Sequence, residues 1–399
     1  MMTTQSRTQK HRKQHISQRA NAIQPSGIRK FFDLLSSIDG VISLGVGEPD
    51  YTTPWHIRES AIESIEKGQT MYTSNSGMPE LRKELSRFLK TEYKVDYDPT
   101  SELLITVGCS EALDLTMRAL IDPGDEVIIP NPCFVAYGSC VTLAGGKPVH
   151  IPTYEANNFE ISAADIEKHI TNKTKAILIG YPSNPTGAVM SRQKLADIAA
   201  LAIKYDLTII SDEIYSKLVY GVEFTCFASL PEMKERTVFL GGFSKAYAMT
   251  GWRVGYAAAP KEIIGAMHKI HQYTMMCVST MSQMAALEAL KGEQESVTEM
   301  VEDYNRRRQV IVKGFRDIGL DCYEPKGAFY AFPSIKCTGM TSEEFAEKLL
   351  SEEKVAVVPG SAFGKCGEGY IRCCYATSLA DIEEALRRMG RFVSKYKKI

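Results

Sequence analysis

Lys245 and Arg253 stand eight residues apart in the stretch GGFSKAYAMTGWRVGY, residues 241–256. Their neighbours in this stretch are mostly small, apolar or aromatic, and none is acidic. An unpaired cation in apolar surroundings is costly, so negative charge must come from elsewhere in the folded protein. A lysine amine can form an imine with an aldehyde, and an arginine guanidinium can bind an oxyanion through two hydrogen bonds.

Five short apolar segments precede residues of this kind. They are LLITV (103–107), EVIIP (126–130), AILIG (176–180), LTIIS (207–211) and TVFL (237–240), the last leading directly to Lys245. Each segment is apolar throughout rather than alternating, which is typical of strands in a parallel sheet that is covered on both faces. Ligands of such sheets bind beyond the carboxyl ends of the strands.

The residues that follow the segments favour one kind of ligand. The backbone N–H groups of residues 108–110 suit a phosphate, to which Arg253 can add a bidentate contact. Phe134 offers a flat apolar face for an aromatic ring. Asp212, if buried, needs a cationic partner such as a protonated ring nitrogen. Together with an aldehyde for Lys245, these features indicate pyridoxal phosphate (PLP).

Each of these residues taken alone also has an ordinary structural explanation. Ser110 and Asp212 could cap helices, and residues 184–187 could form only a turn. Phe134 could belong to the core, and Lys245 could be a surface lysine. The occurrence of all five features at strand ends favours the cofactor site.

Helical patterns such as residues 191–205 separate several of the strands, which predicts an α/β fold with right-handed crossovers. A long helical stretch is expected over 261–290. Thr341 and Glu344 fit a helix capping box, and they fall in a smaller C-terminal unit with further strands. We expect a large PLP-binding domain over 49–290, a small α+β domain formed by 26–48 and 291–399, and a flexible basic arm over 1–25.

The composition excludes several classes of protein. The chain has 399 residues, with 47 basic and 48 acidic side chains, so we expect no nucleic-acid or membrane partner. The first residues lack the apolar region of a secretory signal; they superficially resemble a mitochondrial transit peptide, but we expect an arm. Ten cysteines without CxxC spacing indicate reduced thiols in a cytoplasmic protein. His268 and His271 share a helical face without an evident third ligand, so no metal site is expected.

Five motifs carry a resemblance to a known family. They are GVGEPD (45–50), MYTSNSGMPELR (71–82), YPSNPTG (181–187), SDEIY (211–215) and SKAYAMTGWRVGY (244–256). In order and spacing they resemble the class I/II aminotransferases of PLP fold type I, from about residue 26 to the C-terminus. The chain is similar in particular to Gram-positive bacterial aromatic-amino-acid and N-acetyl-diaminopimelate aminotransferases. The resemblance implies a large domain with a mostly parallel sheet and a smaller α+β domain.

The resemblance also implies a role for each matched residue. Lys245 would form the imine with the cofactor and then move a proton, and Asp212 would pair with the ring nitrogen. Asn184 and Tyr215 would bind the phenolic oxygen of the ring, on which Phe134 would stack. The phosphate would be held by Cys109, Ser110, Arg253 and, from the other subunit of a homodimer, Tyr72. Gly47, Phe134, Asn184 and Arg372 would bind the substrate, with Arg372 clamping its α-carboxylate.

Two positions depart from the family pattern. Many relatives carry a phosphate-binding hydroxyl residue three positions before the lysine, where this chain has Gly242. Ser244 is the candidate to replace it. Phe134 stands where a Trp or Tyr is often found. Both departures imply an adjusted cofactor affinity rather than a different reaction.

The resemblance implies a transaminase that works by two ping-pong half-reactions. Relatives that prefer aspartate can place a lysine at the third position of the phosphate turn, where this chain has Ser110. We therefore expect an aromatic or N-acylated diamino acid as donor and a 2-oxo acid such as 2-oxoglutarate as acceptor. A PLP-dependent β-lyase on the same fold is the alternative. A PLP-sensing regulator is not expected, because about 25 residues before the match are too few for a DNA-binding module.

Overall fold

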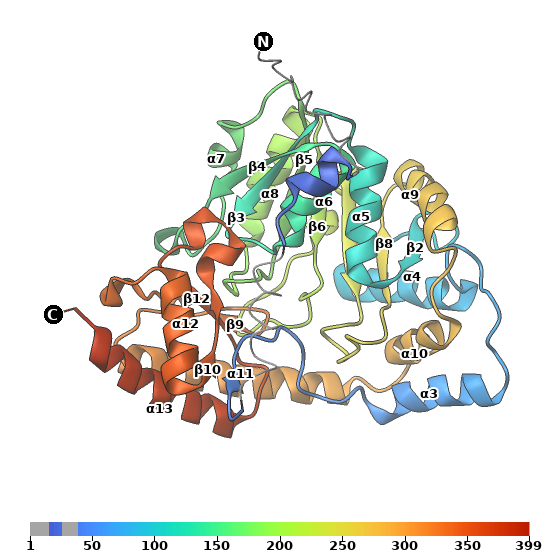
Figure 1. Ribbon diagram of the computed structural model, residues 1–399. Coiled ribbons are helices and arrows are strands. Elements are labelled where there is room, and N and C mark those ends of the chain that lie inside the picture. Colours follow the sequence, from blue (N-terminus) through green and yellow to red (C-terminus); the bar gives the residue numbers. More distant parts are fainter. Residues whose placement is uncertain (1–15, 26–38, 399) are drawn as a thin grey trace, which may run out of the picture.

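The computed structural model describes residues 16–25 and 39–398. A central sheet with helices on both faces forms the larger part of the molecule, and a smaller unit built mainly from the C-terminal third packs beside it (Figure 1). The sheet contains seven strands in the order β2-β8-β7-β6-β5-β3-β4. Their bounds are β2 Leu103–Thr106, β3 Glu126–Asn131, β4 Lys147–Pro152, β5 Thr174–Gly180, β6 Thr208–Asp212, β7 Thr237–Gly242 and β8 Gly255–Ala258.

The five predicted strands are confirmed as β2, β3, β5, β6 and β7, and the sheet is mostly parallel. Only β8 runs against its neighbours β2 and β7. The sequence pattern did not identify β4 or β8. β4 is an edge strand whose Lys147 and His150 are exposed, so it lacks an apolar run. β8 has only four residues and begins two residues after Arg253.

Helices cover both faces of this sheet (Figure 1). They are α3 Trp55–Glu66, α4 Pro79–Tyr93, α5 Gly108–Leu120, α6 Ala136–Ala144, α7 Ala163–Glu167, α8 Arg192–Lys204, α9 Lys261–Thr274 and α10 Thr280–Lys291. The expectation of one helical stretch over 261–290 was wrong, because α9 and α10 are separate helices. Between them Met276 adopts a left-handed φ of 69°, which ends the regular hydrogen-bond pattern.

The smaller unit contains helices α11 Glu295–Asp317, α12 Ser342–Glu353 and α13 Leu379–Tyr396. Strands β9 Tyr330–Ala331, β11 Val358–Pro359 and β12 Ile371–Cys374 form an antiparallel sheet, and β1 Ile42–Ser43 pairs in parallel with β10 Val355–Ala356. The capping box of Thr341 and Glu344 at the start of α12 is confirmed. Through β1, a segment close to the N-terminal end of the chain joins elements more than 300 residues later.

Part of the predicted N-terminal arm is described. Residues 16–25 contain the short helix α1, Gln18–Ala22, which Ser17 caps. The Arg19 guanidinium donates a hydrogen bond to the Leu143 carbonyl near the end of α6, so α1 rests on the large unit. The rest of the arm, residues 1–15, and residues 26–38 of the predicted small domain lie outside the described residues.

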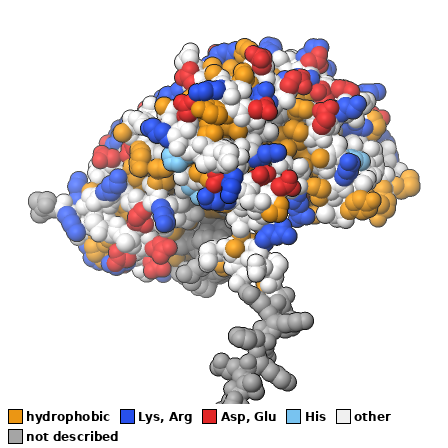
Figure 2. Space-filling model, turned by 90° about the horizontal axis from the view of Figure 1, so that it is seen from above, with side chains coloured by type: hydrophobic (Ala, Val, Ile, Leu, Met, Phe, Trp, Pro, Cys, Tyr) orange, Lys and Arg blue, Asp and Glu red, His pale blue; other side chains and the backbone are white. Residues whose placement is uncertain are grey.

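The surface carries charges of both signs. Figure 2 shows Lys and Arg interspersed with Asp and Glu over one face, in keeping with the formal net charge of −1. Within the described part of the chain, no helix combines the length and apolar character that crossing a membrane would require.

Candidate active site

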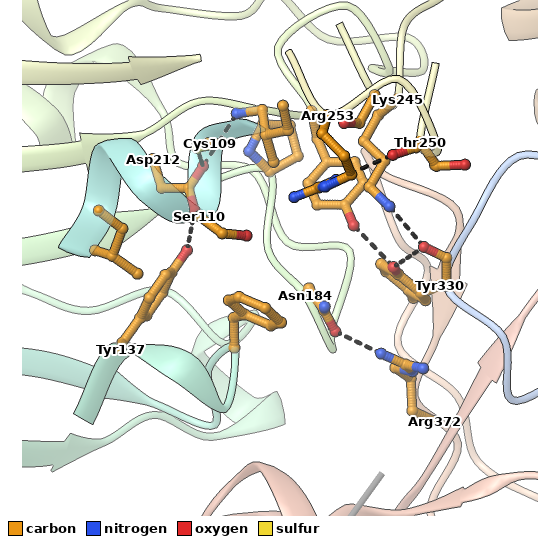
Figure 3. A pocket seen from close by; sticks show the side chains of 17 residues that line it. Cys109, Ser110, Tyr137, Asn184, Asp212, Lys245, Thr250, Arg253, Tyr330 and Arg372 are labelled. Carbon is orange, nitrogen blue, oxygen red and sulfur yellow. Dashed lines mark hydrogen bonds between the residues drawn. The ribbon is translucent and has the colours of Figure 1, made fainter. Parts of the chain in front are cut away.

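A cavity of about 270 Å³ lies where the carboxyl ends of the central strands meet the smaller unit. Eleven of the twelve predicted site residues line it, and these are Gly47, Cys109, Ser110, Phe134, Asn184, Asp212, Tyr215, Ser244, Lys245, Arg253 and Arg372. Figure 3 shows several of them converging from different elements. The exception is Tyr72, whose side chain is 81% exposed and away from this cavity.

One end of the cavity is formed by the turn between β2 and α5. Gly108 begins α5 with a positive φ of 73°, and a Cβ there would lie 2.6 Å from Arg253 Nη2. A Cβ on Gly255 would lie 2.5 Å from the Cys109 backbone nitrogen. The two glycines thus allow Arg253 and β8 to approach the helix start, whose N–H groups lack partners within the helix. Ser110 lies inside the first turn and is not the N-cap, which is Val107.

The carboxylate of Asp212 lies at the end of β6 and is 8% exposed. It accepts hydrogen bonds from the Tyr137 hydroxyl at 2.9 Å and from the Cys109 thiol at 3.6 Å. Burial raises the pKa of Asp212, while the Tyr137 hydrogen bond acts in the opposite direction. A cation in the cavity, such as a protonated ring nitrogen, would stabilise the ionised form. Sequence reasoning missed Tyr137, although its position three residues after Phe134 places both near the start of α6.

Lys245 enters the cavity from the opposite side. Its Nζ donates a hydrogen bond to the Gly47 carbonyl at 2.6 Å, and the rings of Tyr215 and Phe329 lie 6.0 and 5.7 Å away. No acidic side chain within the described residues forms an ion pair with it. Burial lowers the pKa of Lys245 to about 8. A large fraction of neutral amine is therefore present near pH 8.

The lowered pKa gives a direct test. We expect the labelling rate of Lys245 in the cofactor-free enzyme to rise with pH and to level off above about 8, because only the neutral amine reacts. Competitive labelling with acetic anhydride, followed by peptide mass spectrometry, measures this rate. An inflection near the ordinary lysine value of 10.5 would contradict the predicted environment.

Arg372 on β12 lies next to Asn184 (Figure 3). Its Nη1 donates to Asn184 Oδ1 at 3.0 Å, and its Nη2 donates to the Gly45 carbonyl at 2.6 Å. The side chain is 2% exposed, its Nε has no hydrogen-bond partner, and it forms no ion pair within the described residues. A buried guanidinium without an anion is costly. The site is therefore suited to a ligand carboxylate.

A second residue that sequence reasoning missed is Tyr330 on β9. Its hydroxyl lies 2.8 Å from that of Tyr215, and the Arg372 guanidinium lies 4.5 Å from its ring centre. A Cβ on Gly47 would lie 2.6 Å from the Tyr330 hydroxyl, so this close approach requires glycine. Nothing in the spacing of the GAFYAFPSI segment distinguishes this tyrosine from a core residue.

The donor set fits PLP at three separate points. The start of α5 and Arg253 would hold a phosphate, Asp212 would face a ring nitrogen, and Lys245 would meet an aldehyde. Glycines leave the turn open where a Cβ would fill it. This fold and this site define a PLP-dependent enzyme of fold type I.

Comparison with known proteins gives the family. The chain matches the family model "Aminotransferase class I and II" over residues 39–389 and belongs to that family. It is a PLP-dependent aminotransferase. Among its relatives, the Bacillus subtilis protein YugH is 57% identical over 96% of this chain and 99% of its own length.

Two archaeal relatives are each 47% identical over 96% of this chain and 99% of their own. They are an aspartate aminotransferase of Pyrococcus abyssi and aromatic-amino-acid aminotransferase 2 of Thermococcus litoralis. Among solved structures, the Thermus thermophilus aspartate aminotransferase with maleate superimposes with a TM-score of 0.91 at 36% identity, covering 95% of this chain and 99% of that one. The names of these relatives favour an aminotransferase over a β-lyase.

Proposed function

We propose that this enzyme moves the amino group of an L-amino acid to a 2-oxo acid such as 2-oxoglutarate, in two ping-pong half-reactions at one site. The observation that carries the proposal is the buried Arg372, which has no ion-pair partner among the residues that the structure describes and lies in the same cavity as Lys245. Donor and acceptor both carry an α-carboxylate, so one guanidinium can bind each in turn. The reacting carbon would then lie near the lysine amine.

When bound, PLP would supply an aldehyde for the amino group and a ring that can withdraw electrons from the substrate Cα. Lys245 would move a proton between the substrate Cα and C4′, the aldehyde carbon of the cofactor, and its lowered pKa suits a base that works near neutral pH. Asp212 would hold a proton on the ring nitrogen by its negative charge. Tyr137 would orient the Asp212 carboxylate through its 2.9 Å hydrogen bond.

The remaining predicted residues would bind and orient. Asn184 and Tyr215 would face the phenolic oxygen, Phe134 would stack on the ring, and Gly47 would leave room for the substrate. We assign the phosphate to Cys109, Ser110 and Arg253, with Ser244 beside the lysine. A Cβ on Gly242 would lie 3.1 Å from Ile214 Cδ1, so Ile214 crowds the place where relatives carry a hydroxyl.

For the substrate, we propose an aromatic or N-acylated diamino acid as amino donor. Among the described residues, the cations that line the cavity are Lys245, Arg253 and Arg372, and each already has a role. A distal carboxylate buried without a partner would be costly. The chain is equally identical to an aspartate and to an aromatic aminotransferase, so sequence identity favours neither aspartate nor an aromatic donor.

A panel of amino donors with 2-oxoglutarate tests both reaction and substrate. We expect stoichiometric consumption of the 2-oxo acid, and a higher kcat/KM for Phe, Tyr or an N-acylated diamino acid than for aspartate. The cofactor's spectral change reads each half-reaction. An aspartate preference of tenfold, about 1.4 kcal/mol of transition-state binding, would contradict the substrate proposal alone. Release of ammonia and pyruvate without a 2-oxo acid would instead support the β-lyase.

We also propose a cytoplasmic homodimer. Met71 and Tyr72 are neighbouring, largely exposed apolar residues, and the Thr280 hydroxyl donates to the Met71 carbonyl at 2.7 Å. A face of this kind is suited to an obligate interface. Tyr72 would reach the phosphate of the partner subunit. All ten cysteines are free, as expected in a reducing compartment.

The dimer proposal predicts an interface above ~2,000 Å² and a dimer at assay concentration in analytical ultracentrifugation. Mixing subunits that carry Tyr72→Ala with subunits that carry Lys245→Ala should restore activity, because one site of each hybrid then has both residues. A fully active monomer, or hybrids that stay inactive, would contradict shared sites.

We also propose limits for the domains of the chain. We assign 49–290 to the PLP-binding domain, 26–48 with 291–399 to the small domain, and 1–25 to the arm. The pairing of β1 with β10 supports joining the residues before Pro49 to the C-terminal part. Residues 1–15 and 26–38 lie outside the described residues.

A further inference from the structure

Glu111 lies in the first turn of α5, one residue after Ser110, and its side chain is almost fully buried. Its Oε2 accepts a hydrogen bond from the backbone N–H of Val107, the residue before the helix. Its Oε1 lies 2.7 Å from Nδ1 of His271. An ionised carboxylate only accepts, so both neighbours donate to it. Glu111 therefore ties the turn between β2 and α5 to His271.

His271 lies in the last turn of α9, a helix that packs against α5 (Figure 1). Its side chain is 0% exposed, and its Nε2 has no hydrogen-bond partner within the described part of the chain. Glu111 is thus the group that compensates the burial of this imidazole. Neither residue lines the cavity of the active site, so neither contacts substrate there.

The turn held by Glu111 determines where the first N–H groups of α5 point. Gly108 has a left-handed φ of 73°, and its carbonyl accepts a hydrogen bond from the Thr106 hydroxyl at 2.9 Å. The Val107 N–H would otherwise be free to rotate with the turn. A displacement there would move the N–H groups of Cys109 and Ser110 together.

We propose that Glu111 and His271 form a positioning pair for the phosphate of PLP. His271 holds the Glu111 carboxylate, the carboxylate fixes Val107, and Val107 sets the direction of the Cys109 and Ser110 N–H groups. The proposal rests on the phosphate site assigned above and adds two residues that do not touch the cofactor. It also accounts for a buried His and Glu that the reaction itself does not use.

Equilibrium binding to the cofactor-free enzyme tests the pair, with PLP compared to pyridoxal, which lacks the phosphate. We expect Glu111→Ala to weaken PLP binding at least ~10-fold, because the part-buried Val107 N–H loses its acceptor. Pyridoxal binding should change by less than about twofold, since its contacts lie elsewhere. Glu111→Gln keeps an acceptor for Val107 and can donate to His271, so it should stay within about threefold of wild type.

Asp114→Ala is the matched control, because Asp114 lies on the same helix and, in the described part of the chain, its one ion pair is with Arg118 at 2.9 Å. Glu111→Asp, which keeps the charge but is too short to bridge both partners, carries the test if the Ala variant does not fold. PLP binding within twofold of wild type in Glu111→Ala, or in Glu111→Asp where the Ala variant does not fold, would overturn the pair. An equal loss of PLP and pyridoxal binding in that variant would overturn it as well.

Arg253→Ala separates this proposal from the one on which it rests. That variant should weaken the binding of PLP more than the binding of pyridoxal. If it does and the Glu111 variants do not, only the positioning pair is wrong. If Arg253→Ala affects both ligands equally, the phosphate site itself is wrongly assigned.

Discussion

Replacing Lys245 by Ala should lower kcat by at least ~10⁴-fold, the upper range for loss of a positioned general base. Lys245 is the amine that faces the cavity with a pKa lowered to about 8. Its removal leaves Tyr215, Asp212 and Arg372 in place, so substrate and PLP can still enter. Steady-state transamination measures the loss.

Chemical trapping identifies the same lysine independently. The purified wild-type enzyme should be yellow, and borohydride should fix the cofactor to the peptide that contains Lys245. Lys217→Ala is a matched control, because Lys217 pairs with Glu92 outside the active-site cavity. Turnover of the Lys245→Ala variant within tenfold of wild type would contradict the catalytic role of Lys245.

The second large effect is expected for Arg372→Leu. This change removes the α-carboxylate clamp, and kcat/KM for every amino acid should fall by about 10²–10³-fold, or roughly 3–4 kcal/mol. An apolar replacement avoids leaving a new buried charge. Tyr330 and Phe363, whose rings lie 4.5 and 5.0 Å from the guanidinium, would surround the leucine.

An amine without a carboxylate provides the control for Arg372. Wild type should discriminate strongly against 2-phenylethylamine relative to phenylalanine, whereas Arg372→Leu should lose most of that discrimination. Arg372→Lys keeps the charge but not the bidentate geometry, so its discrimination should lie between those of wild type and Arg372→Leu. Unchanged discrimination in Arg372→Leu would show that another group binds the carboxylate.

The sequence alone determined the parallel strands and the cofactor. Each of the five predicted strands is dominated by consecutive apolar residues, because a strand covered on both faces buries neighbouring residues alike. Lys245, Asp212 and Ser110 were found because each closely follows such a run. β4 escaped because its edge position exposes Lys147 and His150, which removes the apolar signal.

Tertiary structure alone decided which distant side chains meet. Tyr137 binds Asp212 across 75 residues, Tyr330 meets Tyr215 across 115, and His271 reaches Glu111 across 160. No local spacing encodes such pairs, because they depend on how elements far apart in the chain, such as α5 and α9, pack together. Burial then sets their chemistry: the same desolvation lowers the pKa of Lys245 and raises that of Asp212, and neither shift can be read from neighbours in the chain.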